Sequence, residues 1–116
     1  MLHPRRSLKR LLPSAARGVR EVKISRLARD DLAAIDEYGV DQFGDIVASE
    51  YSGGLADALE LLSHHPDAGQ ARPEFGKNIR CKVHRKHRIL YRVTGDSVFV
   101  ERIMHHSRDV PRHLPK

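Results

Sequence analysis

The chain has 116 residues, a length that accommodates one domain with one core and is too short for two. Apolar residues make up 40% of it, but aromatic residues only 5% and Trp is absent, so Leu, Ile, Val and Ala must fill the core. The single cysteine, Cys81, excludes an internal disulfide framework, and we expect it to be a small buried apolar residue. A single cysteine fits a reducing cytoplasm, where we expect the protein, and no apolar run is long enough for a membrane span.

The net charge of +6 is distributed unevenly along the chain. Residues 1–20 carry six Lys or Arg and no acid, residues 21–76 carry four bases and twelve acids, and residues 77–116 carry eleven bases and three acids. Segregation of this kind favours a nucleic acid or an acidic protein as partner over ordinary solubilising charge.

Residues 1–20 are interpreted as an extension of the folded domain. Their longest apolar stretch is far too short for a secretory signal. We expect a disordered basic extension, or the product of an upstream start codon. Residues 21–116 then form a single domain.

The first regular elements are a short strand and a helix. Apolar and polar residues alternate over Glu21–Arg26, which predicts a half-buried strand. From Leu27 the apolar period changes to that of a helix, which we expect to end near Gly44. Asp30 and Asp31 lie in its first turn, where acids suit the positive end of the helix dipole. The predicted apolar face consists of Leu32, Ile35 and Tyr38.

A second, longer helix is predicted next. Asp45 can cap it, and His64–Pro66 mark its end. Gly53 and Gly54 inside it weaken it by about 1 kcal/mol each relative to Ala, so tertiary packing must hold it. A loop follows over residues 66–78, because Gly and Pro are frequent there and periodicity is absent. The predicted apolar face of this helix consists of Val47, Tyr51, Leu55, Leu59 and Leu62.

Three strand-like runs occupy the rest of the domain, over Ile79–His84, Arg88–Val93 and Ser97–Met104. The sequence TGDS between the last two marks a tight hairpin, and short links force antiparallel neighbours. The predicted fold is therefore of the α+β class. It consists of an N-terminal strand, a helical hairpin and a three-strand antiparallel meander, with both helices packed on one sheet face.

Alternation along these strands predicts one apolar and one basic sheet face. We expect the helices to cover the apolar face and the basic face to be open. The apolar face is predicted to hold Ile79, Cys81 and Val83 together with Ile89, Tyr91 and Val93. The open face is predicted to carry Arg80, Lys82, Arg88 and Arg92.

The basic residues and histidines raise the question of catalysis. Cleaving RNA without a metal requires a base, an acid and cations near the phosphate, and Lys82, Arg88 and His105 could supply them, with His106 as a second proton carrier. Equally, these histidines can be surface residues with local hydrogen bonds, so both interpretations stay open. The histidine spacing matches no zinc site, and we expect neither a metal nor a cofactor.

Four stretches of the chain, taken together, resemble a known family over about Val22–Leu114. They are LARDDLAAIDEYGVDQFG, LLSHHPDAGQARPE, IRCKVHRKHRILYRV and VERIMHHSRDVPRHL. The chain resembles the ParE branch of the ParE/RelE superfamily of type II toxin–antitoxin toxins. Such membership implies a RelE/ParE-like fold and a cytoplasmic toxin that arrests growth and contributes to plasmid stabilisation. It also implies a cognate antitoxin, whose C-terminal segment wraps around the toxin and holds it inactive.

The superfamily has two main activities. ParE-type members are implied to poison DNA gyrase, whereas RelE-type members cut mRNA on the ribosome. Because no aromatic residue follows Phe99, the ending HHSRDVPRHL is more similar to the gyrase-directed branch. We therefore expect a binding-type gyrase inhibitor rather than an enzyme. The alternatives are a ribosome-dependent mRNA endoribonuclease that uses Lys82, Arg88 and His105, and a stand-alone nucleic-acid-binding module.

The resemblance and the basic pattern together predict a surface for the antitoxin or the target, on the strand face and the C-terminal segment. Asp109 is expected to pair with Arg108 or a nearby strand arginine and to fix the C-terminal turn. The predicted contact residues are Arg80, Lys82, Arg85, Arg88, Tyr91, Arg92, His105, Arg108 and Asp109.

Overall fold

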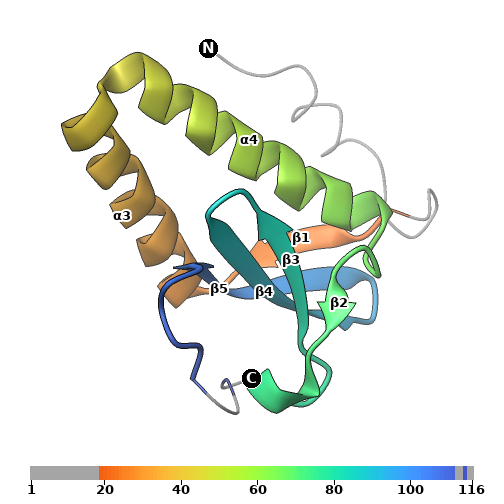
Figure 1. Ribbon diagram of the computed structural model, residues 1–116. Coiled ribbons are helices and arrows are strands. Elements are labelled where there is room, and N and C mark those ends of the chain that lie inside the picture. Colours follow the sequence, from red (N-terminus) through yellow and green to blue (C-terminus); the bar gives the residue numbers. More distant parts are fainter. Residues whose placement is uncertain (1–18, 112–113, 115–116) are drawn as a thin grey trace.

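A computed structural model describes residues 19–111 and residue 114 of the chain, so residues 1–18 of the expected basic extension lie outside the described residues. Two helices form a hairpin that packs across one mixed sheet (Figure 1). No helix in this part of the chain is long and apolar enough to cross a bilayer. The elements in chain order are β1 (Glu21–Ile24), α3 (Arg26–Phe43), α4 (Asp45–His64), β2 (Gln70–Ala71), the 3-10 turn η1 (Pro73–Phe75), β3 (Arg80–His84), β4 (His87–Thr94) and β5 (Ser97–His105).

The sheet has five strands in the order β1-β5-β4-β3-β2. The predicted antiparallel meander of β3, β4 and β5 is confirmed. β1 lies parallel to β5 at one edge, and the helical hairpin supplies the long crossover that a parallel pair requires. The predicted loop over residues 66–78 is partly wrong, because it contains η1 and the short strand β2, which pairs with β3. The α+β fold with both helices on one sheet face is confirmed.

Both predicted helices form, and local contacts fix their ends. Ser25 begins α3, because its Oγ accepts a hydrogen bond from the N–H of Ala28 at 3.0 Å. Gly44 ends α3 with φ at +88°, a conformation that favours glycine. The prediction that Asp45 caps α4 is wrong, because Gly44 occupies the cap position and no side chain caps the helix.

The two glycines inside α4 do not interrupt it. A Cβ on Gly54 would lie only 3.1 Å from Nε2 of His84, so the glycine lets the helix approach the β3–β4 hairpin closely. Tertiary packing therefore compensates for the low helix propensity of Gly, as predicted.

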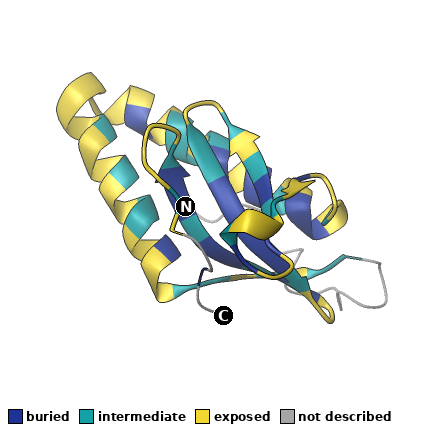
Figure 2. Ribbon diagram, turned by 60° about the horizontal axis from the view of Figure 1, so that its bottom comes forward, coloured by how far each residue is buried: buried dark blue, intermediate teal, exposed yellow. Residues whose placement is uncertain are grey.

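The main core lies between the helices and the sheet. Leu55, Leu59 and Leu62 are buried, as their helical spacing predicts. The predictions for Tyr38 and Val47 are wrong: they are 63% and 48% exposed, because the far end of the helical hairpin extends beyond the sheet (Figure 2). The buried sheet residues opposite the helices are Ile89, Tyr91, Val98, Val100 and Ile103.

A smaller apolar cluster covers the opposite face of the sheet, so the predicted open basic face is wrong. Cys81, Leu90 and Met104 belong to this cluster, and Phe75 of η1 and Leu114 of the C-terminal segment pack with them. The cysteine is 5% exposed, which confirms it as a buried residue, and burial raises the pKa of its thiol. The C-terminal segment and η1 thus cover a face that the sequence pattern assigns to solvent.

The turn between β3 and β4 explains this error. It has two residues, so that His84 pairs with His87 across the strands. Residues paired in this way share a sheet face, and odd-numbered residues of β3 therefore lie with even-numbered residues of β4. The predicted basic set is divided by this register, with Arg80 and Lys82 on the helix-covered face and Arg88 and Arg92 on the opposite one.

Candidate functional site

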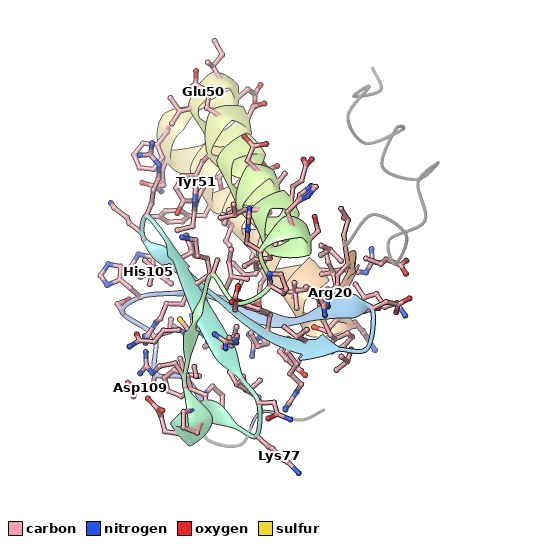
Figure 3. All side chains as sticks on the ribbon, turned by 90° about the vertical axis from the view of Figure 1, so that its right-hand side faces the viewer. Arg20, Glu50, Tyr51, Lys77, His105 and Asp109 are labelled. Carbon is pink, nitrogen blue, oxygen red and sulfur yellow. The ribbon has the colours of Figure 1, made fainter. Side chains whose placement is uncertain are left out.

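A groove of about 660 Å³ runs between the helical hairpin and the end of the sheet where β5 ends. One wall comes from both helices, and the other from the β3–β4 turn, the end of β5 and the residues that follow it. Figure 3 labels two of the lining residues, Tyr51 of α4 and His105 of β5, which lie on the same edge of the molecule. Segments distant in the sequence thus build one site.

The helical wall of the groove is apolar and exposed. Tyr38 is 63%, Phe43 61% and Val47 48% exposed, and all three line the groove. Large apolar side chains that gather on a free surface indicate a binding site. This wall therefore suits the apolar face of a partner.

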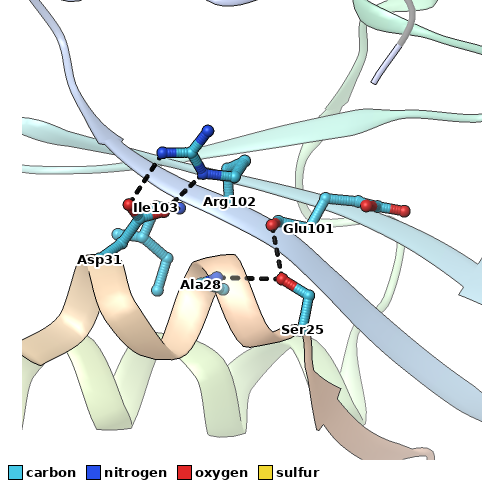
Figure 4. A network of polar contacts seen from close by, with 6 residues as sticks. All are labelled: Ser25, Ala28, Asp31, Glu101, Arg102 and Ile103. Atoms are coloured by element: carbon cyan, nitrogen blue, oxygen red, sulfur yellow. Dashed lines mark hydrogen bonds and ion pairs between the residues drawn. The ribbon is translucent and has the colours of Figure 1, made fainter. Parts of the chain in front are cut away.

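The opposite wall is cationic, because Arg85, Lys86 and Arg108 line it. Asp31 is the one acid among the described groove residues, and its carboxylate is already occupied. Arg102 donates to it from Nε at 2.8 Å and Nη2 at 2.9 Å, and the N–H of Ile103 donates at 2.9 Å (Figure 4). The groove therefore offers net positive charge to a partner.

A tyrosine and four histidines form a ring cluster, of which Tyr51, His87 and His105 line the groove. Tyr51 Oη lies 2.6 Å from His87 Nδ1. The two atoms form a hydrogen bond whose donor depends on the tautomer of the His87 ring. Burial raises the pKa of Tyr51, so the phenol keeps its proton at neutral pH. Edge-on and stacked ring contacts extend the cluster to His84, His105 and His106.

Two rings of the cluster, His84 and His87, lie in surroundings that disfavour their protonation. Burial lowers the pKa of both His84 and His87, and neighbouring positive groups lower it further, so both rings are uncharged at neutral pH. Within the described residues, no three histidine, cysteine or acidic side chains are placed to hold one metal ion. The neighbours that lower the pKa of His87 are His105, His84 and His106, opposed by Asp31, and those of His84 are Arg85 and Lys82, opposed by Asp57.

Two predicted contact residues hold the backbone in place. Arg80 donates from Nη1 to the carbonyl oxygen of Gly69, next to β2. Arg88 donates from Nη2 to the carbonyl oxygens of His106 and Arg108, at 2.8 Å each, and so fixes the turn after β5. Both guanidinium groups are therefore engaged within the fold.

Two further predicted contact residues are buried, so neither is accessible to a partner in this structure. Tyr91 is fully buried, and its Oη donates to the carbonyl oxygen of Pro66 at 2.7 Å and accepts from the N–H of Gly69 at 2.8 Å. Arg92 is 7% exposed, and its Nε donates to the carboxylate of Glu101 at 2.8 Å. Tyr91 fixes the loop before β2, and Arg92 stabilises the face away from the helices.

The predicted ribonuclease set is not assembled on one surface. The strand register places Lys82 and His105 on the helix-covered face and Arg88 on the opposite face. Asp109 lines a smaller hollow that it shares with Arg88, outside the groove. Among the described residues it forms no ion pair with Arg108 or a strand arginine, so that predicted pairing is wrong. Of the predicted contact residues, the groove brings together Arg85, His105 and Arg108.

Sequence reasoning misses the apolar wall. The helical spacing of Tyr38 and Val47 predicts core residues, because periodicity does not distinguish a buried face from a docking face. The length of the helices is a signal that could have predicted this wall. α3 and α4 have 18 and 20 residues, which correspond to about 27 and 30 Å, so they extend beyond a small sheet. The contact of Tyr51 with His87 joins residues 36 apart and leaves no local signal.

The fold is shared with solved toxin–antitoxin systems. A chain of the chromosomal ParDE system from P. aeruginosa has a TM-score of 0.66 and 24% identity, with 75% of this chain and 96% of that chain covered. A chain of the toxin–antitoxin complex RelBE2 from Mycobacterium tuberculosis has a TM-score of 0.55 and 21% identity, with 75% and 98% covered. These likenesses define the class of fold as RelE/ParE-like.

Sequence comparison narrows the class to one family. The model of the ParE toxin of the type II toxin–antitoxin system parDE matches residues 22–110. Toxin ParE1 from Caulobacter vibrioides is 30% identical over 92 residues, which are 79% of this chain and 95% of that protein. Toxin ParE1 from Mycobacterium tuberculosis is 34% identical over 80 residues, 68% of this chain and 76% of that protein. The chain therefore belongs to the ParE toxin family of type II toxin–antitoxin systems.

Proposed function

We propose that this toxin inhibits DNA gyrase, and that it is neutralised when a segment of its cognate antitoxin occupies the groove. The proposal that the antitoxin occupies the groove is carried by one observation, namely that an exposed apolar wall and a cationic wall face each other there. Its structural relatives belong to toxin–antitoxin complexes, which supports an antitoxin as the partner.

The groove suits an amphipathic segment, in the manner of a helix that lays its apolar face into a hydrophobic groove. The apolar face of this segment packs against Tyr38, Phe43 and Val47. Its acidic side chains pair with Arg85 and Arg108 on the opposite wall. A disordered antitoxin segment can gain enough apolar and ionic contact here to offset the cost of ordering.

Two observations support gyrase as the target. The relatives with significant sequence identity are named ParE toxins, and the resemblance to the ParE branch implies gyrase. The cations and histidine proposed for RNA cleavage lie on two different faces of the sheet, which disfavours the ribonuclease alternative. A toxin that acts on DNA gyrase works in the cytoplasm, so this location is part of the proposal.

Expression without antitoxin tests this function. We expect growth to stop and incorporation of labelled thymidine to fall before incorporation of labelled methionine, because replication is blocked first. Co-expression of the cognate antitoxin should restore both signals. With purified components, the toxin should inhibit supercoiling by gyrase and leave mRNA on ribosomes intact. Early arrest of translation with cut transcripts would instead establish the ribonuclease.

A further inference from the structure

Four of the eight histidines of the chain belong to one ring cluster with Tyr51, and two of them, His87 and His105, line the groove. The ring centroids of Tyr51 and His87 lie 5.5 Å apart, those of His87 and His105 5.4 Å, and those of His105 and His106 4.4 Å. Apolar and ionic docking of an antitoxin does not by itself require a chain of imidazoles. The cluster therefore calls for a separate explanation.

We propose that His87 and His105 couple antitoxin binding to proton uptake, so that the acidic segment binds more tightly as the pH falls from about 8 to about 6. This inference rests on the proposed antitoxin site. It concerns how that site is regulated, and it assigns the two histidines as the contacts of acidic side chains.

The surroundings of His87 in the free toxin favour its uncharged form. The hydroxyl of Tyr51 lies 2.6 Å from Nδ1 of His87, so a neutral group occupies this ring nitrogen and no acid does. The groups that face His87 from the β3–β4 turn, β3, β5 and α4 are neutral or positive, and the one acid that faces it is Asp31 of α3. The neutral or positive groups are Tyr51, His84, Arg85, Lys86, His105 and His106.

Among the described groove residues, Asp31 is the one acid that raises the pKa of His87, and other groups already share its charge. Asp31 binds both Arg102 nitrogens and the N–H of Ile103, so its carboxylate is already compensated. His105 accepts at Nδ1 from the N–H of Ser107 at 3.1 Å, and no acid is among its described partners. An acidic side chain of the antitoxin is therefore the group that can stabilise the imidazolium form.

The sign of the effect follows from linkage. Burial and positive neighbours lower the pKa of His87 in the free toxin. A bound carboxylate raises it, because an opposite charge favours the protonated ring. At pH values between the pKa of His87 in the free toxin and its pKa in the complex, the complex binds more protons than the free components. Affinity therefore rises as the pH falls. One coupled proton changes the affinity by up to about tenfold per pH unit.

Calorimetry of the full-length toxin with its antitoxin, isolated from the co-expressed complex, tests this. Titrations at pH 6.5 in buffers of different ionisation enthalpy count the protons taken up. Titrations at pH 6 and pH 8 at one ionic strength give the change in affinity. We expect uptake of about one proton and an affinity about tenfold higher at pH 6.

Two variants locate the proton. His87→Asn places a side-chain amide near the position of Nδ1, where it remains a hydrogen-bond partner for the Tyr51 hydroxyl but cannot be protonated. The double variant His87→Asn/His105→Asn should bind the antitoxin without net proton uptake. His64→Gln, at an exposed histidine on the last turn of α4, is the matched control and should behave as the unchanged toxin.

The outcomes separate this inference from the proposed function. Tight binding without proton uptake, or uptake that persists in the double variant, overturns the role of the histidines and keeps the antitoxin site. Equally strong proton-coupled binding of an RNA oligonucleotide also overturns it. No antitoxin binding at any pH contradicts the proposed site itself. If the double variant fails to fold, NMR titration of His87 and His105 decides, and a pKa that does not rise on binding refutes the proposal.

Discussion

At the scale of single residues, burial decides what each arginine does. Arg92 resembles a surface cation in sequence, yet its Nε donates to the carboxylate of Glu101 at 2.8 Å and both side chains are less than a tenth exposed. Its other nitrogens donate to the carbonyl oxygens of Lys77 and Leu114. One buried guanidinium therefore ties the loop before β3 and the C-terminal segment to the sheet.

Removing the charge of Glu101 should strongly destabilise the protein. We expect Glu101→Gln to lower the free energy of unfolding by about 3–5 kcal/mol, because it leaves the buried Arg92 charge without its counter-ion. Glu74→Gln is the control, since Glu74 pairs with Arg72 at the surface and its loss should cost about 0–1 kcal/mol. Urea unfolding measures both, and equal losses contradict the structural role of the buried pair.

At the scale of elements, the first turns of α3 are attached to the sheet, whereas its far end extends beyond the sheet. Ser25 caps the helix and also donates from Oγ to the carbonyl oxygen of Glu101 at 2.7 Å (Figure 4). One and a half turns further on, Asp31 binds Arg102 and Ile103 of β5, and its hydrogen bond raises the pKa of Arg102. The anchored end positions the helical wall of the groove.

Asp31→Asn tests this anchor. We expect it to lower the free energy of unfolding by about 1.5–3 kcal/mol, because the amide accepts from Ile103 but loses the charge-assisted pair with Arg102. Asp30→Asn changes an exposed neighbour in the same helix and should have little effect. Thermal and urea unfolding compare the two, and an equally stable Asp31→Asn protein would show that packing alone holds α3.

At the scale of the whole molecule, the two faces of the sheet serve different purposes. The helices cover one face, and the far end of their hairpin extends beyond the sheet (Figure 2). The apolar side chains Tyr38, Phe43 and Val47 are exposed there. The C-terminal segment and η1 cover the other face, where an apolar cluster replaces the expected cationic surface. Within the described residues, the groove at the edge between the helices and the sheet combines exposed apolar side chains with cations.

Phe43→Ser tests whether the groove binds the antitoxin. Because Phe43 is 61% exposed, the change should leave the free energy of unfolding nearly unchanged and weaken antitoxin binding by about 10- to 100-fold, as expected of an apolar anchor. Val83→Ser is the matched control, since Val83 is 60% exposed and does not line the groove. Titration calorimetry at one pH measures both, and an equal effect of the two changes argues against the groove.

The sequence predicts features that depend on neighbours along the chain. The period of Leu55, Leu59 and Leu62 locates the buried face of α4, and Gly44 marks the junction of the two helices. The sequence TGDS identifies the β4–β5 hairpin. The residues of the candidate site were harder to predict, because Tyr51, His87 and His105 belong to three elements that meet only after folding.

The sequence by itself determined the order of β1, α3, α4, β3, β4 and β5, the buried face of α4 and membership of the ParE toxin family, because these follow from local period, turn chemistry and family motifs. Only the tertiary structure decided which cations are accessible. A two-residue turn sets the register that separates Lys82 from Arg88, and Leu114 covers the face that contains Arg92. Strand register and the packing of a distant segment are non-local, so no pattern within a single strand specifies them.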